Sequence, residues 1–211
     1  MNPPSDHLHV SIVPPVITPL GKREDRKNLD KAIFWDRDGV IVEDKGHISS
    51  PDALVLRPGI VEALSQFRTE FRSIIVTNQS GIARGYFNEM ELREIHQRLL
   101  HLLDDGGGLI DAIYYCPHHP TEGTQKYTTE CECRKPKPGL VFSAAKHFGV
   151  ELAHSITVGD KSRDIEAGKA AGTRTILVQS SVPYSSTSLP DRIATQFDQV
   201  VLAIRDLSSN F

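Results

Sequence analysis

The fold is decided by the stretch Ala32-Ile33-Phe34-Trp35-Asp36-Arg37-Asp38-Gly39-Val40. Its first four residues are all apolar, which indicates a strand buried on both faces, as in a parallel sheet. Two acids follow where the strand should end, and ligands of open parallel sheets gather beyond the carboxyl ends of the strands. Side chains at i and i+2 lie on the same side of an extended chain. We therefore expect Asp36 and Asp38 to point together into a crevice, where a cation such as Mg²⁺ would relieve their repulsion; the alternative is an acidic turn that only caps the strand.

The composition is that of a globular domain with a substantial core. The chain has 211 residues, of which 39% are hydrophobic and 24% charged, a length that suits one domain with or without insertions. Its net charge of −3 gives no basic surface for nucleic acid. No apolar run approaches the length of a membrane span, and no signal peptide opens the sequence. We expect a cytoplasmic protein with neither nucleic acid nor membrane as a partner.

The order of the elements predicts the architecture. Residues 1–29 are rich in proline and charge and are expected to form an extended or disordered leader to a domain spanning 30–211. Within that domain, strand and helix patterns alternate, which predicts an α/β fold with a doubly wound, Rossmann-like parallel sheet. The segments 40–57 and 116–134 are too short for a large cap. A short strand or turn near Val200 and a final helix complete the chain. The expected strands cover 31–35, 73–76, 109–115, 155–158 and 175–178, and the main helices 60–67, 88–103, 139–148 and 162–171.

Several of these strands end in polar residues that suit a single reaction. Thr77 follows the second strand, Asp160 and Asp164 follow the fourth, and Lys135 lies in the loop before a helix. Carboxylates that hold Mg²⁺, a hydroxyl and a lysine are the groups that phosphoryl transfer needs, and a carboxylate such as Asp36 can attack phosphorus. Each residue also has a plainer interpretation: Thr77 as part of a strand-ending turn, Asp164 as a solvated helix residue or an outer partner of the site.

All three cysteines fall in one segment of low apolar content, residues 116–133. Cys116, Cys131 and Cys133, together with His118 or its neighbour His119, have the spacing and the ligand types of a tetrahedral structural Zn²⁺ site. The alternatives are free thiols or a strained bridge between Cys131 and Cys133. Zinc is favoured because one metal would use every cysteine and would supply the folding free energy that this segment lacks.

Taken together, four segments resemble the motifs of the haloacid dehalogenase (HAD) superfamily of phosphatases over roughly residues 31–180. These segments are Asp36-Arg37-Asp38-Gly39, Ile74-Ile75-Val76-Thr77-Asn78, Lys135, and Val158-Gly159-Asp160-Lys161. Within that superfamily, residues 77–85, 114–120 and 131–136 are similar to the heptose-bisphosphate phosphatases. The combination is far more specific than any single motif.

The resemblance implies a role for each site residue. Asp36 would be the nucleophile, Asp38 the general acid and then the base, and Thr77 and Lys135 would steady the transferring phosphoryl group. Mg²⁺ would be held by Asp36, Asp160 and the backbone carbonyl of Asp38. His118, not His119, would complete the zinc site. The residues expected to face the substrate are Asp44, His47, Asn78, Gln79, Ser80 and Arg134, with Lys161 beside the metal.

The activity that the resemblance implies is Mg²⁺-dependent hydrolysis of a phosphorylated sugar by a monomer. The expected substrate is the 7-phosphate of D-glycero-D-manno-heptose 1,7-bisphosphate, a precursor of nucleotide-activated heptose and lipopolysaccharide. A histidinol-phosphate phosphatase is the alternative within this class, and a non-catalytic zinc-stabilised binding module is the alternative outside it. Two departures from the family pattern stand out: His47 after Gly46, where Tyr is usual, and Val40, where Thr is usual. The first bears on substrate choice and the second on packing.

Overall fold

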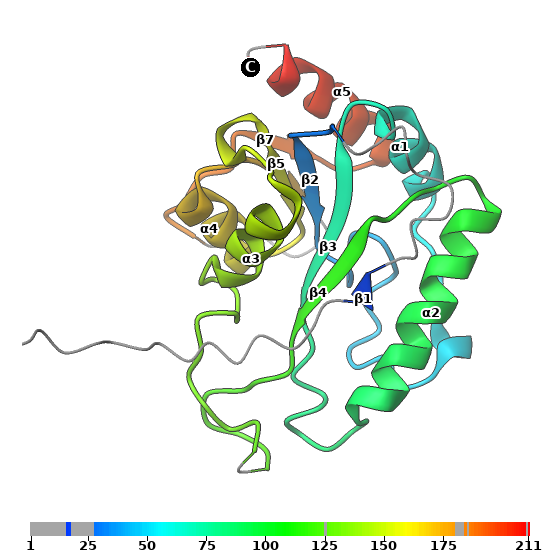
Figure 1. The fold of residues 1–211 in the computed structure, drawn as a ribbon, viewed down its shortest axis with the longest axis vertical. Coiled ribbons are helices and arrows are strands. Elements are labelled where there is room, and N and C mark those ends of the chain that lie inside the picture. The colour runs from blue at the N-terminus through cyan, green and yellow to red at the C-terminus, as the bar shows by residue number, and fades with distance from the viewer. Residues whose placement is uncertain (1–15, 18–27, 125, 180–183, 185, 210) are drawn as a thin grey trace, which may run out of the picture.

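The structure is a computed structural model, and it describes residues 16–17, 28–124, 126–179, 184, 186–209 and 211. Its centre is a seven-stranded sheet with the order β1-β4-β3-β2-β5-β6-β7 (Figure 1). All neighbouring strands are parallel except β1, which pairs with β4 in the antiparallel direction. The strand that carries the opening sequence, β2 (Ala32–Trp35), lies in the middle of the sheet.

The other elements alternate around β2. The remaining strands are β1 (Val16–Ile17), β3 (Arg72–Asn78), β4 (Ala112–Cys116), β5 (Ile156–Gly159), β6 (Arg174–Val178) and β7 (Arg192–Ala194). The helices are α1 (Ile60–Phe67), α2 (Glu89–Asp105), α3 (Gly139–Phe148), α4 (Ser162–Ala171) and α5 (Phe197–Ser208), with short 3-10 turns η2 (Pro51–Ala53) and η3 (Leu152–His154). None of these helices combines the length and the apolar character that crossing a bilayer requires.

Helices cover both faces of the sheet, and β2 shows why. Successive residues of a strand point to opposite faces: Ile33 and Trp35 pack in one core with α1, α2 and α5, while Ala32 and Phe34 pack in another core with α3 (Figure 1). All four side chains are fully buried. The apolar run therefore serves two cores at once, which is the reason that its sequence shows no alternation.

The helix ends follow local sequence signals. The Asn88 side chain accepts hydrogen bonds from the backbone N–H groups of Met90 and Glu91, and Glu91 accepts from the Asn88 backbone, so α2 begins with a capping box. Helices α3 and α4 end at Gly149 and Gly172, which adopt the left-handed conformation that glycine favours. The predicted bounds of α3 and α4 agree with the structure to the residue.

The doubly wound fold without a large cap is confirmed, with one error near the end of the chain. Val200 lies in α5 and is buried, so the strand or turn expected there is wrong; the strand of this region is β7, six residues earlier. Val16–Ile17 of the predicted leader forms the edge strand β1. Residues 1–15 and 18–27 lie outside the described residues, so the extended leader stays a prediction.

The register of the sheet brings the polar strand ends to one place. Trp35 is level with Ile75 of β3 and with Val158 of β5. The residues that follow these strands therefore emerge at the same edge, and the Asp36 N–H donates to the Val158 carbonyl at 2.9 Å. Residues 117–124 and 126–138 extend beyond this edge from the end of β4 (Figure 1).

Candidate active site

Three carboxylates meet beyond the ends of β2 and β5. One oxygen each from Asp36, Asp160 and Asp164 lies within 4.8 Å of the others, a spacing that could hold a metal ion. Burial and the charge of Asp36 raise the pKa of Asp160 to about 7, and the same two causes raise the pKa of Asp164. The cluster thus holds more negative charge than its surroundings compensate, and a divalent cation would neutralise it.

Lys135 faces two of these carboxylates from inside the protein. Its Nζ lies 2.8 Å from Asp36 Oδ1 and 2.7 Å from Asp164 Oδ1, and it donates to the Val76 carbonyl at 2.8 Å. Burial lowers the pKa of Lys135, but the Asp164 and Asp36 charges outweigh burial and raise it above its ordinary value. Lys135 is therefore a fixed cation, and its charge attracts an anion that approaches Asp36.

Two features of Asp160 fit a bound cation. Its Oδ1 is buried and has no hydrogen-bond partner among the described residues, a costly arrangement for a carboxylate oxygen unless a ligand accompanies it. Its Oδ2 lies where Gly39 leaves room: a Cβ on Gly39 would approach it to 2.3 Å. Hard oxygen donors of this kind are the ligands that Mg²⁺ prefers.

We expect Gly39→Ala to weaken Mg²⁺ binding by at least about tenfold, because the new methyl group must displace the Asp160 carboxylate. The matched control is Gly172→Ala: φ is +86° at Gly172 and +88° at Gly39, but a Cβ on Gly172 meets no atom within 4 Å. Both variants carry the same backbone strain. Isothermal titration with Mg²⁺ measures the difference, and equal Mg²⁺ affinity in the two variants would contradict it.

The affinity for Mg²⁺ is expected to fall as the pH drops below about 7, the pKa of Asp160 in the metal-free protein. The metal needs the deprotonated carboxylate, so each binding event releases a proton in this range, and the loss approaches about tenfold per pH unit at lower pH. Titrations between pH 5.5 and 8, in buffers of different ionisation enthalpy, measure both effects. An affinity that does not change over that range would rule out this role for Asp160.

Asp38 belongs to a second group of side chains beside the carboxylate cluster. Its carboxylate accepts hydrogen bonds from the Arg37 guanidinium at 3.0–3.2 Å and from Gln79 Nε2 at 2.9 Å. Gln79 Nε2 also donates to the buried Thr77 hydroxyl at 2.9 Å. The side chain of Asp38 is thus held by Arg37 and Gln79, and its backbone carbonyl stays the predicted third Mg²⁺ ligand.

The residues expected to face the substrate have partners that the sequence did not suggest. The Asn78 amide donates to the Lys135 carbonyl and accepts from the Lys135 N–H, both at 3.0 Å, so it fixes the backbone of that lysine. Lys161 Nζ pairs with Asp44 and lies 3.6 Å from Asp160. His47 is exposed and packs edge-on against Tyr86. Ser80 is buried and Arg134 half-buried. Their contacts with a substrate stay predictions.

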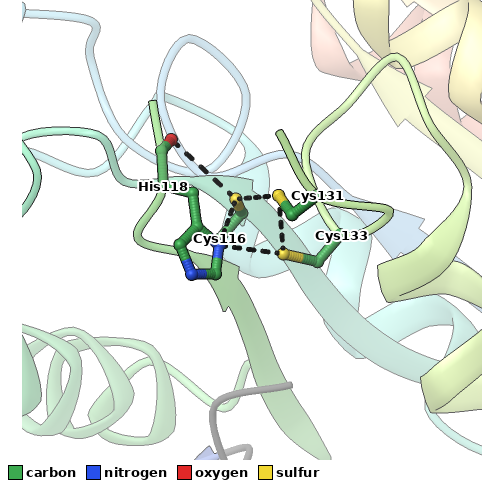
Figure 2. A group of neighbouring side chains, drawn as sticks. All are labelled: Cys116, His118, Cys131 and Cys133. Carbon is green, nitrogen blue, oxygen red and sulfur yellow. Dashed lines mark hydrogen bonds between the residues drawn. The ribbon is translucent and has the colours of Figure 1, made fainter. Parts of the chain in front are cut away.

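The thiol and imidazole groups of the 116–133 segment form one cluster. Figure 2 shows the sulfur atoms of Cys116, Cys131 and Cys133 turned toward one another and toward the ring of His118. Cys131 Sγ lies 3.6 Å from Cys116 Sγ and 3.2 Å from Cys133 Sγ, and His118 Nδ1 lies 3.7 Å from Cys116 Sγ and 3.4 Å from Cys133 Sγ. A tetrahedral Zn²⁺ with ordinary bond lengths would give edges of about 3.6–3.8 Å, so the four groups fit that ion.

The neighbouring histidine is turned away from this cluster. His119 Nδ1 accepts from the Thr121 and Glu122 N–H groups, and its Nε2 lies 3.2 Å from Arg84. The geometry therefore selects His118 over His119 as the candidate ligand. The pKa of Cys131 is lowered because the other two thiols donate hydrogen bonds to its sulfur, whereas the pKa values of Cys116 and Cys133 are raised, so the metal-free cluster favours a single thiolate at Cys131.

Two residues, Asp164 and Arg37, have a larger part in the site than their neighbours in the sequence indicate. Asp164 is buried and belongs to the carboxylate cluster, so its interpretation as a solvated helix residue is wrong. The available signal was its place in the first turn of α4, where its carboxylate also accepts from the Lys161 N–H. Arg37, which separates the two acids of the opening motif, is 1% exposed and holds Asp38. Nothing in its immediate sequence indicated burial.

Comparison with known proteins supports the same chemistry. The HAD-hydrolase-like family matches residues 132–207. The D-glycero-beta-D-manno-heptose-1,7-bisphosphate 7-phosphatase of Pasteurella multocida (strain Pm70) is 43% identical over 159 residues, covering 74% of this chain and 86% of that protein. The D-glycero-alpha-D-manno-heptose-1,7-bisphosphate 7-phosphatase of Burkholderia mallei (strain ATCC 23344) is 37% identical over 179 residues, covering 84% and 92% of the two chains.

A solved structure extends the likeness to the fold. The D,D-heptose 1,7-bisphosphate phosphatase from B. bronchiseptica, complexed with magnesium and phosphate, superposes with a TM-score of 0.70 at 33% identity, over 83% of this chain and 98% of that one. Identity at this level over most of both chains shows common membership, and it agrees with the carboxylate cluster at the strand ends. This chain is a phosphoric monoester hydrolase and belongs to the heptose-1,7-bisphosphate 7-phosphatase family of HAD phosphatases.

Proposed function

We propose that the protein removes the 7-phosphate of D-glycero-D-manno-heptose 1,7-bisphosphate in a Mg²⁺-dependent reaction. The observation that carries the proposal is the convergence of Asp36, Asp160 and Asp164 opposite Lys135, because it gathers a nucleophile, a cation site and an anion-binding ammonium at one edge of the sheet. The family relatives and the magnesium and phosphate complex of the B. bronchiseptica enzyme support the substrate and the metal.

In the first step, an oxygen of the Asp36 carboxylate attacks the phosphorus atom and the bond from phosphorus to the sugar oxygen breaks. The Asp38 carboxyl group gives its proton to the departing sugar oxygen. Lys135 and the Thr77 hydroxyl bind phosphoryl oxygens and keep the group in line. Asp36, Asp160 and the Asp38 carbonyl would hold Mg²⁺, which would supply positive charge to neutralise the phosphoryl oxygens.

In the second step, the ionised Asp38 carboxylate takes a proton from water as the water oxygen attacks the aspartyl-phosphate. The bond between phosphorus and the Asp36 oxygen breaks, so Asp36 returns as a carboxylate and inorganic phosphate leaves. The proton that Asp38 loses in the first step is regained from water in the second, so the enzyme returns to its starting protonation state.

We also propose a structural Zn²⁺ at Cys116, His118, Cys131 and Cys133. Cys133 lies two residues before Lys135, and the Arg134 guanidinium donates to the His118 carbonyl at 3.0 Å. A metal that fixes the three thiolates and the imidazole would therefore fix the backbone from which Arg134 and Lys135 project. The low apolar content of residues 117–132 supports this role, because packing alone offers that segment little stability.

Substrate selection is assigned to the short loops around the cluster. We propose that Asp44, His47, Asn78, Gln79, Ser80, Arg134 and Lys161 border the sugar, with Asp44 held toward the cluster by its pair with Lys161. The relatives act on different anomers, beta in Pasteurella multocida and alpha in Burkholderia mallei. His47 is the residue of this group that departs from the family pattern, so its loop bears most directly on the preference.

We further propose that residues 30–211 form the phosphatase domain, which acts as a cytoplasmic monomer with no nucleic-acid partner. A net charge of −3 disfavours nucleic acid.

The test is phosphate release from a panel of substrates with and without Mg²⁺. The panel contains both anomers of heptose 1,7-bisphosphate, histidinol phosphate and fructose 1,6-bisphosphate. We expect the heptose bisphosphates to have the highest kcat/KM, with loss of the 7-phosphate alone, and no turnover after chelation of Mg²⁺. A preference for histidinol phosphate would replace the proposed substrate, and the absence of any turnover would favour a non-catalytic binding module.

A further inference from the structure

Arg37 is a buried cation whose partners extend in three directions. Its Nε and Nη2 hold both oxygens of the Asp38 carboxylate, and Nη2 also donates to Gln79 Oε1 at 3.0 Å. Its remaining nitrogen, Nη1, lies 3.2 Å from Nε2 of His96. A planar guanidinium has a fixed fork of donors, so the direction of one N–H group determines the direction of the others.

His96 forms the far end of this group and belongs to none of the catalytic motifs. It lies in the middle of α2 and is fully buried, with its ring edge-on to Tyr115 at 5.8 Å. Because arginine can only donate, His96 Nε2 must be the acceptor and the ring proton must lie on Nδ1. Burial and the Arg37 charge lower the pKa of His96 well below its ordinary value, which keeps the ring neutral and able to accept.

We propose that His96 is a positioning residue for the general acid and base: it fixes the Arg37 guanidinium, and Arg37 holds the Asp38 carboxylate at one orientation. The inference rests on the proposed phosphatase chemistry, in which Asp38 moves a proton to the sugar oxygen and then takes one from water. His96 contacts Arg37 and Tyr115, so it acts on Asp38 through Arg37.

The contacts of Asp38 explain why this positioning matters. Its side chain is 16% exposed, and all the hydrogen bonds that its carboxylate accepts within the described residues come from Arg37 and Gln79. Gln79 is itself held by Arg37 and by Thr77. Without His96 Nε2 as an acceptor, the Arg37 guanidinium can rotate. Gln79 would then shift as well, because Arg37 holds it, and Asp38 would lose its fixed orientation. The transfer of a proton depends on such geometry at the scale of one ångström.

The test compares leaving groups in three variants. A sugar oxygen needs a proton to depart, whereas p-nitrophenolate departs without one. We expect His96→Leu to lower kcat for a sugar phosphate about 10- to 100-fold, part of the contribution of general acid catalysis, with KM within about threefold. With p-nitrophenyl phosphate, His96→Leu should release the initial burst of p-nitrophenolate at the wild-type rate. Steady turnover should then be slow, because hydrolysis of the aspartyl-phosphate also needs Asp38. His96→Gln, which keeps an acceptor near the Nε2 position, should stay within about threefold of wild type.

Leu99→Ala is the control for loss of packing, because Leu99 is also fully buried on α2. It should lower the unfolding temperature without changing the ratio of the two substrates. If His96→Leu does not fold, His96→Asn carries the same expectation, because its shorter amide does not reach the Nε2 position. Equal losses on the sugar phosphate and in the p-nitrophenolate burst, or no loss on either, would overturn the inference.

The same experiment separates this inference from the proposed function. A wild-type protein that hydrolyses neither substrate would contradict the proposed function itself. A wild-type protein that hydrolyses a sugar phosphate other than the heptose bisphosphate would change the substrate and leave the role of His96 open to the comparison above. Wild-type activity with an unchanged leaving-group ratio in the His96 variants would reject the inference alone.

Discussion

Asp36→Asn is expected to abolish phosphatase turnover, with a loss on the order of 10⁴-fold or more, as removal of a nucleophile gives in other covalent mechanisms. The amide cannot attack phosphorus, and it is a poorer ligand for Mg²⁺. The variant should nevertheless fold. Asp36 is one of the charges that raise the pKa of Asp160 and Asp164, so its neutralisation relieves repulsion in the metal-free cluster. Lys135 keeps Asp164 as a partner at 2.7 Å.

The unfolding temperature of metal-free Asp36→Asn at pH 8 should therefore equal or exceed that of wild type, while phosphate release is lost. Glu94→Gln, which removes an exposed carboxylate from α2, is the charge-matched control and should leave both quantities unchanged. Residual turnover above about 1% of wild type in Asp36→Asn would contradict its assignment as the nucleophile. A large loss of stability would instead show that Asp36 compensates Lys135 more than it repels its neighbours.

Cys131→Ser is expected to release Zn²⁺ and to lower kcat roughly 100-fold, although residue 131 holds no substrate. The expected cause is the short connection to the active site: with the cluster open, Lys135 can shift from its position beside Asp36, and an error of about 1 Å in such a group can cost two orders of magnitude. The unfolding temperature should fall as well, because zinc binding supplies folding free energy. Zinc content, phosphate release and thermal unfolding measured on the same preparation check the three effects.

His119→Asn is the matched control for the zinc site, because His119 is adjacent to a candidate ligand but faces Arg84 and the Thr121 and Glu122 backbone. It should retain zinc. Full zinc content in Cys131→Ser would contradict the metal site. Loss of zinc with wild-type turnover would leave the metal site in place and remove its proposed link to Lys135.

The sequence was most informative where a local property, such as an apolar run or a helix cap, determines the structure of a segment. The unbroken apolar run before Asp36 identified a central strand, and the cap at Asn88 and the glycine at 149 gave helix ends that agree with the structure. The spacing of the three cysteines identified a cluster whose atoms do converge. In each case the signal is local, or it depends on residue types that seldom gather for another reason.

The sequence was least informative where the burial and the contacts of a residue depend on elements far away in the chain. The burial of Asp164 depends on the approach of Lys135 from another segment, and the role of Arg37 depends on a histidine 59 residues away. Val200 has the β-branched side chain that strands favour, yet α5 packs it in the core beneath the sheet. Tertiary contacts of this kind leave no pattern in neighbouring residues. A single sequence therefore predicts the candidate metal ligands better than the residues that hold the site in place.

The lack of a large cap has a consequence for the fate of the phosphorylated protein. The described residues form one sheet with a helical layer on each face, and the segments at the two insertion points, 40–57 and 117–138, are short. Enzymes that hand a phosphoryl group to a second alcohol must shut out solvent while they do so. A hydrolase must instead let water reach the phosphorylated carboxylate, and the short segments at both insertion points place little chain over the strand ends where Asp36 lies.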